Sequence, residues 1–177
     1  MFRKILIFGA IAGLIVGGIL FGMTVAHGDK PPLRYGMLIG YASMLVALSF
    51  VFVGIKRHRD EDLGGAIRFL PALGMGLAIS LVAGIFYVVA WEAALATTGM
   101  DFAAEYGRQV LDQKRAAGAS EAQLAELATQ MAAFAKQYAN PMFRIPMTFV
   151  EIFPVGVLVS LVSAALLRKP GFMPAKR

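Results

Sequence analysis

The chain has 177 residues, of which 58% are hydrophobic and only 16% charged, and its mean hydropathy is +0.68. This composition is too apolar for a water-soluble domain of that size, so it predicts one membrane domain covering residues 1–177. The net charge is +6, but the basic residues lie at the ends of apolar runs and indicate membrane topology rather than binding to nucleic acid. The lack of cysteine excludes disulfides, thiolate catalysis and lipid attachment at cysteine.

Four apolar stretches are long enough to cross a bilayer, whose core needs about 20 helical residues. The first could also be a signal peptide, but it is longer than the usual apolar region of a signal, so a retained helix fits better. We therefore predict an all-α integral membrane protein with four spans. They cover residues 5–26, 35–55, 69–97 and 143–167.

The distribution of lysine and arginine predicts the orientation of the spans. Basic residues precede the first span, follow the fourth and lie between the second and third, so both termini are expected in the cytoplasm. The connection between the second and third spans, Lys56-Arg-His-Arg-Asp-Glu-Asp-Leu-Gly-Gly65, is interpreted as a topology signal followed by a tight turn. Its basic residues leave open a site for anionic lipid headgroups.

The long connection between the third and fourth spans has apolar residues at helical spacing. It predicts two amphipathic helices within about residues 100–140, forming a hairpin outside the cytoplasm. Gly118 separates the helices, Ser120 with Gln123 forms a capping box for the second, and Asn140-Pro141 ends it. Its apolar stripe must be covered by the partner helix, the spans, lipid or another subunit.

Small residues recur at every fourth position in the spans, where they allow helix backbones to approach closely. Intramolecular packing is the preferred interpretation, and a dimer interface is the alternative. In the first two spans these residues are Gly9, Gly13, Gly17, Gly36 and Gly40.

Two carboxylates lie within predicted spans, Glu92 in the third and Glu151 in the fourth. Charged groups are costly in a membrane and usually face protein, water or a partner charge. Arg144 lies on the same helical face as Glu151 and is expected to compensate it, while His27 could border the same outer layer. These four residues are the candidate polar site.

Three interpretations of this polar site remain open: structural pairing, a protonatable or cation-binding site, and a metal site. The metal site is the weakest, because two carboxylates and one distant histidine match no known ligand spacing. We predict no catalytic residue, cofactor or metal. Pro154 is expected to kink the fourth span near Glu151, either as a static bend or as a hinge.

Several short motifs carry a resemblance to a known family. They are Gly36-Met-Leu-Ile-Gly40, Gly54-Ile-Lys-Arg-His-Arg-Asp60, Leu63-Gly-Gly65, Trp91-Glu92, Asn140-Pro-Met-Phe143 and Glu151-Ile-Phe-Pro-Val-Gly156. By these motifs the chain resembles the bacterial inner-membrane family catalogued as domain of unknown function 4199. The resemblance implies a bacterial membrane protein and provides no activity or catalytic residues.

The sequence therefore predicts a non-enzymatic accessory or scaffold subunit of the bacterial inner membrane, with the hairpin contacting a partner. The alternative is a small oligomeric transporter or proton-coupled carrier that uses Glu92 and Glu151. A membrane enzyme ranks third, since no nucleophile and base stand out. The expected partners are membrane lipids, a second copy, or another membrane or periplasmic protein.

Overall fold

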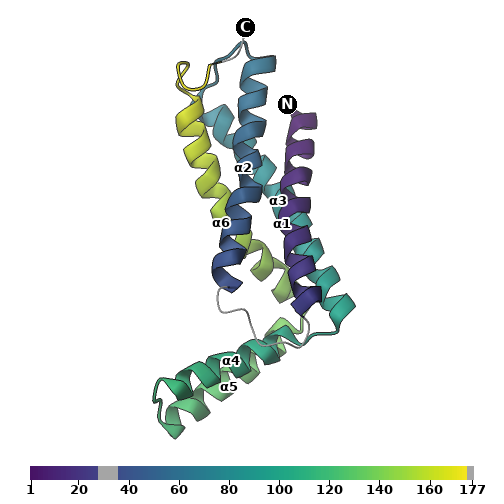
Figure 1. Cartoon of the computed structure of the whole chain (residues 1–177), viewed down its shortest axis with the longest axis vertical. Coiled ribbons are helices and arrows are strands. Elements are labelled where there is room, and N and C mark those ends of the chain that lie inside the picture. The colour runs from purple at the N-terminus through teal and green to yellow at the C-terminus, as the bar shows by residue number, and fades with distance from the viewer. Residues whose placement is uncertain (28–35, 175–177) are drawn as a thin grey trace.

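The computed structural model describes residues 1–27 and 36–174, apart from the side chain of His27. These residues form six α-helices and no strand (Figure 1). Four of the helices are long and apolar enough to cross a membrane, which confirms an all-helical chain with four apolar spans. The helices are α1 (Phe2–His27), α2 (Gly36–Asp62), α3 (Phe69–Thr98), α4 (Phe102–Ala116), α5 (Glu121–Tyr138) and α6 (Pro141–Leu167).

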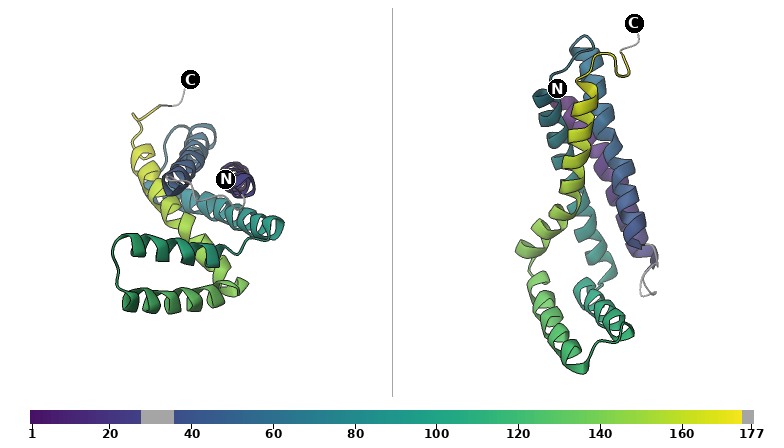
Figure 2. Two further views of the ribbon diagram at one scale, coloured as in Figure 1. Left: turned by 60° about the horizontal axis from the view of Figure 1, so that its bottom comes forward. Right: turned by 90° about the vertical axis from the view of Figure 1, so that its left-hand side faces the viewer.

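The four long helices, α1, α2, α3 and α6, pack side by side and bury a common apolar core (Figures 1 and 2). The most extensive contacts join α1 to α3 and α3 to α6, while α2 packs against α1 and α6. The start of α1 and the segment that follows α6 lie at one end of this assembly, together with the turn between α2 and α3. Helices α4 and α5 lie at the opposite end. The fully buried core side chains include Leu48, Val51, Ile55 and Ile79.

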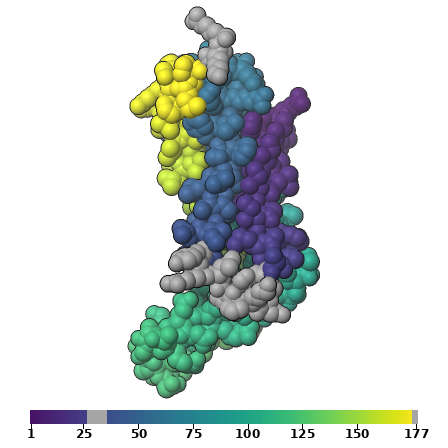
Figure 3. Space-filling model, in the orientation of Figure 1, coloured from purple at the N-terminus to yellow at the C-terminus, as the bar shows by residue number. Residues whose placement is uncertain are grey.

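Helices α4 and α5 lie side by side and project beyond the long helices, as Figure 3 also shows; we call this pair the arm. Asp101 caps α4 by accepting a hydrogen bond from the backbone N–H of Ala104. The predicted capping box at the start of α5 is present, with reciprocal bonds between Ser120 and Gln123. Gly118 has a φ of 83°, a left-handed conformation that glycine adopts without steric cost, and it lies in the turn between the helices.

Glycines in α1 allow the close approach of α1 to α3. A Cβ atom added to Gly13 would lie 2.5 Å from the Cβ of Phe86, and one added to Gly9 would lie 2.5 Å from the Cβ of Val82. Gly17 is also constrained, since its added Cβ would lie 2.9 Å from the Cβ of Ala90, whereas Gly40 in α2 has open space around it. The small residues of α1 thus contact a neighbouring helix of the same chain, but Gly40 does not.

Two helices extend beyond the predicted spans. Helix α2 continues to Asp62, seven residues past the expected end of the span, so the charged residues 56–62 are helical and the predicted tight turn follows at Leu63-Gly-Gly65. Oppositely charged side chains four residues apart stabilise those last turns. Helix α6 begins at Pro141, because Asn140 accepts a hydrogen bond from the N–H of Met142 and acts as its N-cap. Asn140-Pro141 therefore starts α6, and α5 has already ended at Tyr138.

Candidate functional site

The polar site predicted from the sequence lies along the contact between α3 and α6, near the arm. Glu92 is six residues before the end of α3, and Arg144 is in the first turn of α6, which runs antiparallel to α3. Their side chains therefore meet at the same level. The Nε of Arg144 donates to Oε1 of Glu92 at 2.7 Å and its Nη2 donates to Oε2 at 2.5 Å. This two-point geometry is the strongest form of an arginine–carboxylate pair.

Arg144 also connects this pair to the arm. Its Nη1 donates to the carbonyl of Tyr138 at 3.4 Å, and its guanidinium carbon lies 5.8 Å from the centre of the Tyr138 ring. Tyr138 is the last residue of α5. One arginine thus contacts α3, α5 and its own helix α6, so it fixes the end of the arm relative to two long helices.

A buried aromatic cluster lies beside Arg144. The indole Nε1 of Trp91 donates to the hydroxyl of Tyr138 at 2.8 Å. Phe102 of α4 contacts both rings, with centroids 5.1 Å from Trp91 and 5.4 Å from Tyr138. Burial raises the pKa of Tyr138, which keeps its hydroxyl protonated. The cluster continues into the arm through Tyr106 and Phe134, whose centroids are 6.1 Å apart.

Glu151 does not join the Glu92–Arg144 pair. It lies seven residues after Arg144, which is about 10 Å further along α6. At that level its neighbour on α3 is the buried Tyr87, whose side chain faces the carboxyl group of Glu151. The expectation that Arg144 compensates Glu151 is therefore wrong, because the antiparallel packing aligns Arg144 with Glu92.

Glu151 is exposed on the surface of α6, near the middle of the helix. Among the residues that the structure describes, no lysine, arginine or histidine forms an ion pair with it. Pro154 lies inside the same helix one turn later, where its ring removes the backbone N–H that would bond to the carbonyl of Val150. A second proline, Pro146, also lies inside α6 and was not considered from the sequence. The side chain of His27 lies outside the described residues.

The described part of the chain holds no group of three or more histidine, cysteine, aspartate or glutamate side chains arranged to bind a metal. Glu92 has both carboxylate oxygens bonded to Arg144, so neither oxygen is free of a strong donor. Glu92 and Glu151 are also at different levels, because Tyr87, the neighbour of Glu151, lies about 7.5 Å from Glu92 along α3. The two carboxylates do not form one site.

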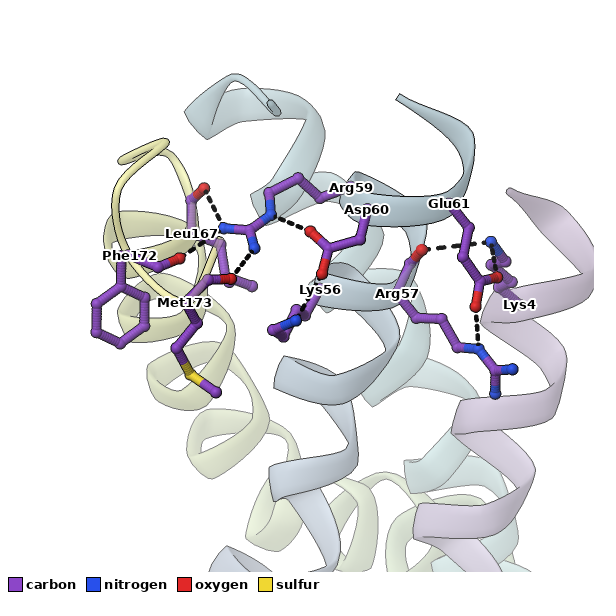
Figure 4. Close-up of polar contacts among 9 residues, drawn as sticks. All are labelled: Lys4, Lys56, Arg57, Arg59, Asp60, Glu61, Leu167, Phe172 and Met173. Atoms are coloured by element: carbon purple, nitrogen blue, oxygen red, sulfur yellow. Dashed lines mark hydrogen bonds and ion pairs between the residues drawn. The ribbon is translucent and has the colours of Figure 1, made fainter. Parts of the chain in front are cut away.

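The opposite end of the molecule has a second polar network, centred on the fully buried Arg59 of α2 (Figure 4). Its guanidinium donates to the carbonyls of Phe172 at 2.9 Å and Met173 at 2.6 Å, and more weakly to that of Leu167 at 3.5 Å. Its Nε donates to Asp60 at 2.6 Å, which supplies the compensating charge. Arg59 therefore holds the chain segment after α6 against the end of α2.

A neighbouring set of ion pairs joins the start of α1 to the end of α2. The ammonium group of Lys4 lies 2.9 Å from Glu61, to which Arg57 also bonds at 2.6 Å (Figure 4). Lys4 also lies 2.8 Å from Asp62. His58 is buried and bonds to Asp62 at 2.6 Å. Basic residues of this run are thus paired with acidic residues, which weakens the interpretation of the run as a lipid-headgroup site.

The match to a known protein family includes Glu92, Arg144 and Arg59. The profile described as Protein of unknown function (DUF4199) matches residues 7–169, nearly the whole chain. The chain belongs to this family. The resemblance seen in the sequence is thereby confirmed. No curated protein and no solved structure gives a significant match.

In this DUF4199 chain, sequence reasoning identified Glu92 and Arg144 but missed two of the contacts that matter. The bond between Trp91 and Tyr138 joins residues 47 apart in sequence, so no local pattern reveals it. The role of Arg59 was also missed. The sequence does contain a signal for the burial of Arg59. If the helix is continued through the charged run, Arg59 and His58 fall on the same face of α2 as the core residues Ile55 and Val51.

Proposed function

We propose that this chain is a non-enzymatic accessory or scaffold subunit of a bacterial inner-membrane assembly, with the arm as its contact element outside the cytoplasm. The observation that carries the proposal is the attachment of the arm to the long helices through Arg144, Glu92, Trp91 and Tyr138. An arm held in a fixed direction can present a binding surface without losing much conformational entropy on binding.

The charges at the opposite end support the proposed orientation. The start of α1, the end of α2 and the segment after α6 are joined there by Lys4, Arg57 and Arg59. Arg3, Arg168 and Lys169 are exposed at the same end. Because positive residues beside spans remain in the cytoplasm, both chain ends belong there and the arm faces the other side.

The surface of the arm supports contact with a folded partner more than insertion into lipid. Its large apolar side chains pack against each other and against Trp91, and Tyr106 is the single large apolar residue of α4 and α5 that stays highly exposed, at 45%. The exposed positions are mainly charged or amide side chains. Such a surface suits a polar protein interface of the accessory type.

Site-specific photocrosslinking tests the proposal in intact cells. A photoreactive amino acid at the exposed arm positions Gln113 or Gln130 should give one defined protein adduct, and the same label at the exposed Leu14 of α1 provides the control. The variant Arg144→Ala, which frees the arm, should reduce the adduct from the arm positions. If both arm positions give no adduct while the protein remains in the membrane, the proposal fails.

The second candidate function is a small oligomeric cation or proton carrier, favoured by the exposed Glu151 within α6. Glu92 contributes less to this function than the sequence suggested, since Arg144 neutralises it. Flux of protons or sodium into liposomes containing the wild-type chain, compared with Glu151→Gln, tests this function. Equal flux through the wild-type chain and Glu151→Gln would exclude the carrier function.

A further inference from the structure

The exposed face of α6 carries a continuous stripe of apolar side chains with one charged residue in it. Val150 is 63% exposed and Leu158 is 58% exposed, and Glu151 lies between them on the same face. The stripe extends over about four helical turns. Its members are Met147, Val150, Glu151, Pro154, Leu158 and Leu161.

Glu151 is one of two hydrogen-bond acceptors on this stripe. Pro154 has no backbone N–H, so the carbonyl of Val150 lacks the donor that an ordinary helix would provide. An ionised carboxylate and a free carbonyl only accept hydrogen bonds, and neither finds a donor in lipid. Within the described chain Tyr87 faces Glu151, but its neutral hydroxyl does not compensate a negative charge, so the stripe is matched by a group that donates and carries a positive charge.

The rest of the described chain does not supply a cationic donor. Arg144, the nearest basic residue on α6, is fully engaged by Glu92, and the neighbour of Glu151 on α3 is the neutral hydroxyl of Tyr87. The basic residues at the other end of the molecule are too distant, because Arg168, the next one after Glu151 along α6, lies about 25 Å further on. The complement to Glu151 is thus expected from outside this part of the chain.

We propose that this face of α6 binds a membrane-spanning helix of a partner protein that carries a lysine or arginine opposite Glu151. This inference rests on the proposed function as a subunit, and it names the surface and the chemistry of a second contact, within the membrane. Charged residues in spans are found paired with one another, because pairing offsets the cost of placing each charge away from water.

The shape and the charges of the face favour a helix over other occupants. The stripe follows the length of a convex helix, whereas small ligands bind in concave pockets. A second copy of this chain is a poorer match, because residues 5–26, 36–55, 69–97 and 145–167 contain no lysine or arginine. A copy therefore has no basic side chain to place at the level of Glu151.

The test uses the full-length chain and a synthetic helix in phosphatidylcholine vesicles. Energy transfer is measured between the labelled chain and a leucine–alanine helix of about 20 residues that bears one central lysine. The matched probe has leucine in place of that lysine. Wild-type protein should associate with the lysine helix at least about threefold more strongly than with the leucine helix, in line with polar contacts between membrane helices.

The variants locate the effect. Glu151→Gln should abolish the preference for the lysine helix, Glu151→Asp should retain most of it, and Glu126→Gln on the exposed surface of the arm should leave it unchanged. Equal association of both helices with the wild-type protein overturns the proposal. Energy transfer between labelled copies of the chain that is lost in Glu151→Gln also overturns the proposal, because it would show that this face of α6 binds a second copy.

Failure of this test is distinct from failure of the proposed function. The vesicles contain no natural partner and do not engage the arm, so a negative result removes the α6 contact alone. Photocrosslinking from Gln113 and Gln130 reports on the arm independently.

Discussion

Arg144 at the start of α6 and Glu92 near the end of α3 form a two-point ion pair, with donor–acceptor distances of 2.7 and 2.5 Å. The pair is partly shielded, with 17% and 29% of the two side chains exposed. It lies where the arm leaves the long helices, so it connects the membrane-spanning part of the chain to the part that we propose contacts a partner. Its strength determines how firmly the arm is held.

Breaking this pair should destabilise the protein. Glu92→Gln leaves an arginine that cannot lose its charge, so we expect a loss of about 1–3 kcal/mol in the free energy of unfolding, between the values for exposed and buried pairs. Arg144→Gln should cost a similar amount. The double variant should cost less than the sum of the two, as measured by unfolding in detergent micelles. Additive losses, within about 0.5 kcal/mol, would contradict a direct interaction.

The bond between Trp91 and Tyr138 should control the mobility of the arm. Tyr138→Phe leaves the buried indole N–H without its acceptor, which costs about 1–3 kcal/mol. Hydrogen exchange of the backbone amides in residues 121–138 should become faster, with little change in α1. Tyr106→Phe is the control, because Tyr106 is 45% exposed and removal of its hydroxyl should leave exchange unchanged. If hydrogen exchange in Tyr138→Phe is as slow as in the parent protein, the arm is held by other contacts.

The fold could be predicted largely from local patterns, because each long helix is a run of apolar residues and the arm helices have clear caps. Ser120 and Gln123 predicted the start of α5 correctly. The partner of Arg144 could not be predicted in the same way. Sequence spacing places Arg144 and Glu151 on one face of a helix, but the choice of Glu92 depends on the register between α3 and α6, which only their packing determines.

The same limit explains the network around Arg59. A run of basic and acidic residues after an apolar stretch is usually a solvated connection, so it was interpreted as a topology signal and a turn. Burial of Arg59 depends on residues after α6, more than 100 positions away, whose carbonyls accept its hydrogen bonds. Contacts of that kind are set by tertiary structure.

Arg59 should be required to hold the segment after α6 in place. Phe172 of this segment also packs edge-on against Phe52, at 6.3 Å between ring centroids. Because the natural chain has no cysteine, a single nitroxide label at Gly171→Cys, where an added side chain meets open space, reports on the segment alone. Arg59→Gln should increase the mobility of this label in its electron paramagnetic resonance spectrum.

Two comparisons complete the Arg59 experiment. Arg59→Lys retains the charge but lacks the planar fork that reaches two carbonyls, so it should give an intermediate mobility. Arg57→Gln serves as the matched control, because Arg57 is exposed and bonds to Glu61 without reaching the segment. If the label has the same mobility in Arg59→Gln as in the parent protein, the segment is held by Phe172 rather than by Arg59.

Two glycines of α1 should respond oppositely to the same substitution. In Gly13→Ala the new methyl group would lie 2.5 Å from the Cβ of Phe86, so α1 and α3 must separate, and we expect a loss of about 1–3 kcal/mol in stability. Gly18→Ala places its methyl group in open space, where the better helix propensity of alanine should raise stability by up to about 1 kcal/mol. Thermal unfolding of the purified variants in one detergent measures both. Loss of stability in both variants would mean that the exposed face of α1 is also packed, and a neutral Gly13→Ala would show that α1 and α3 approach less closely than the structure describes.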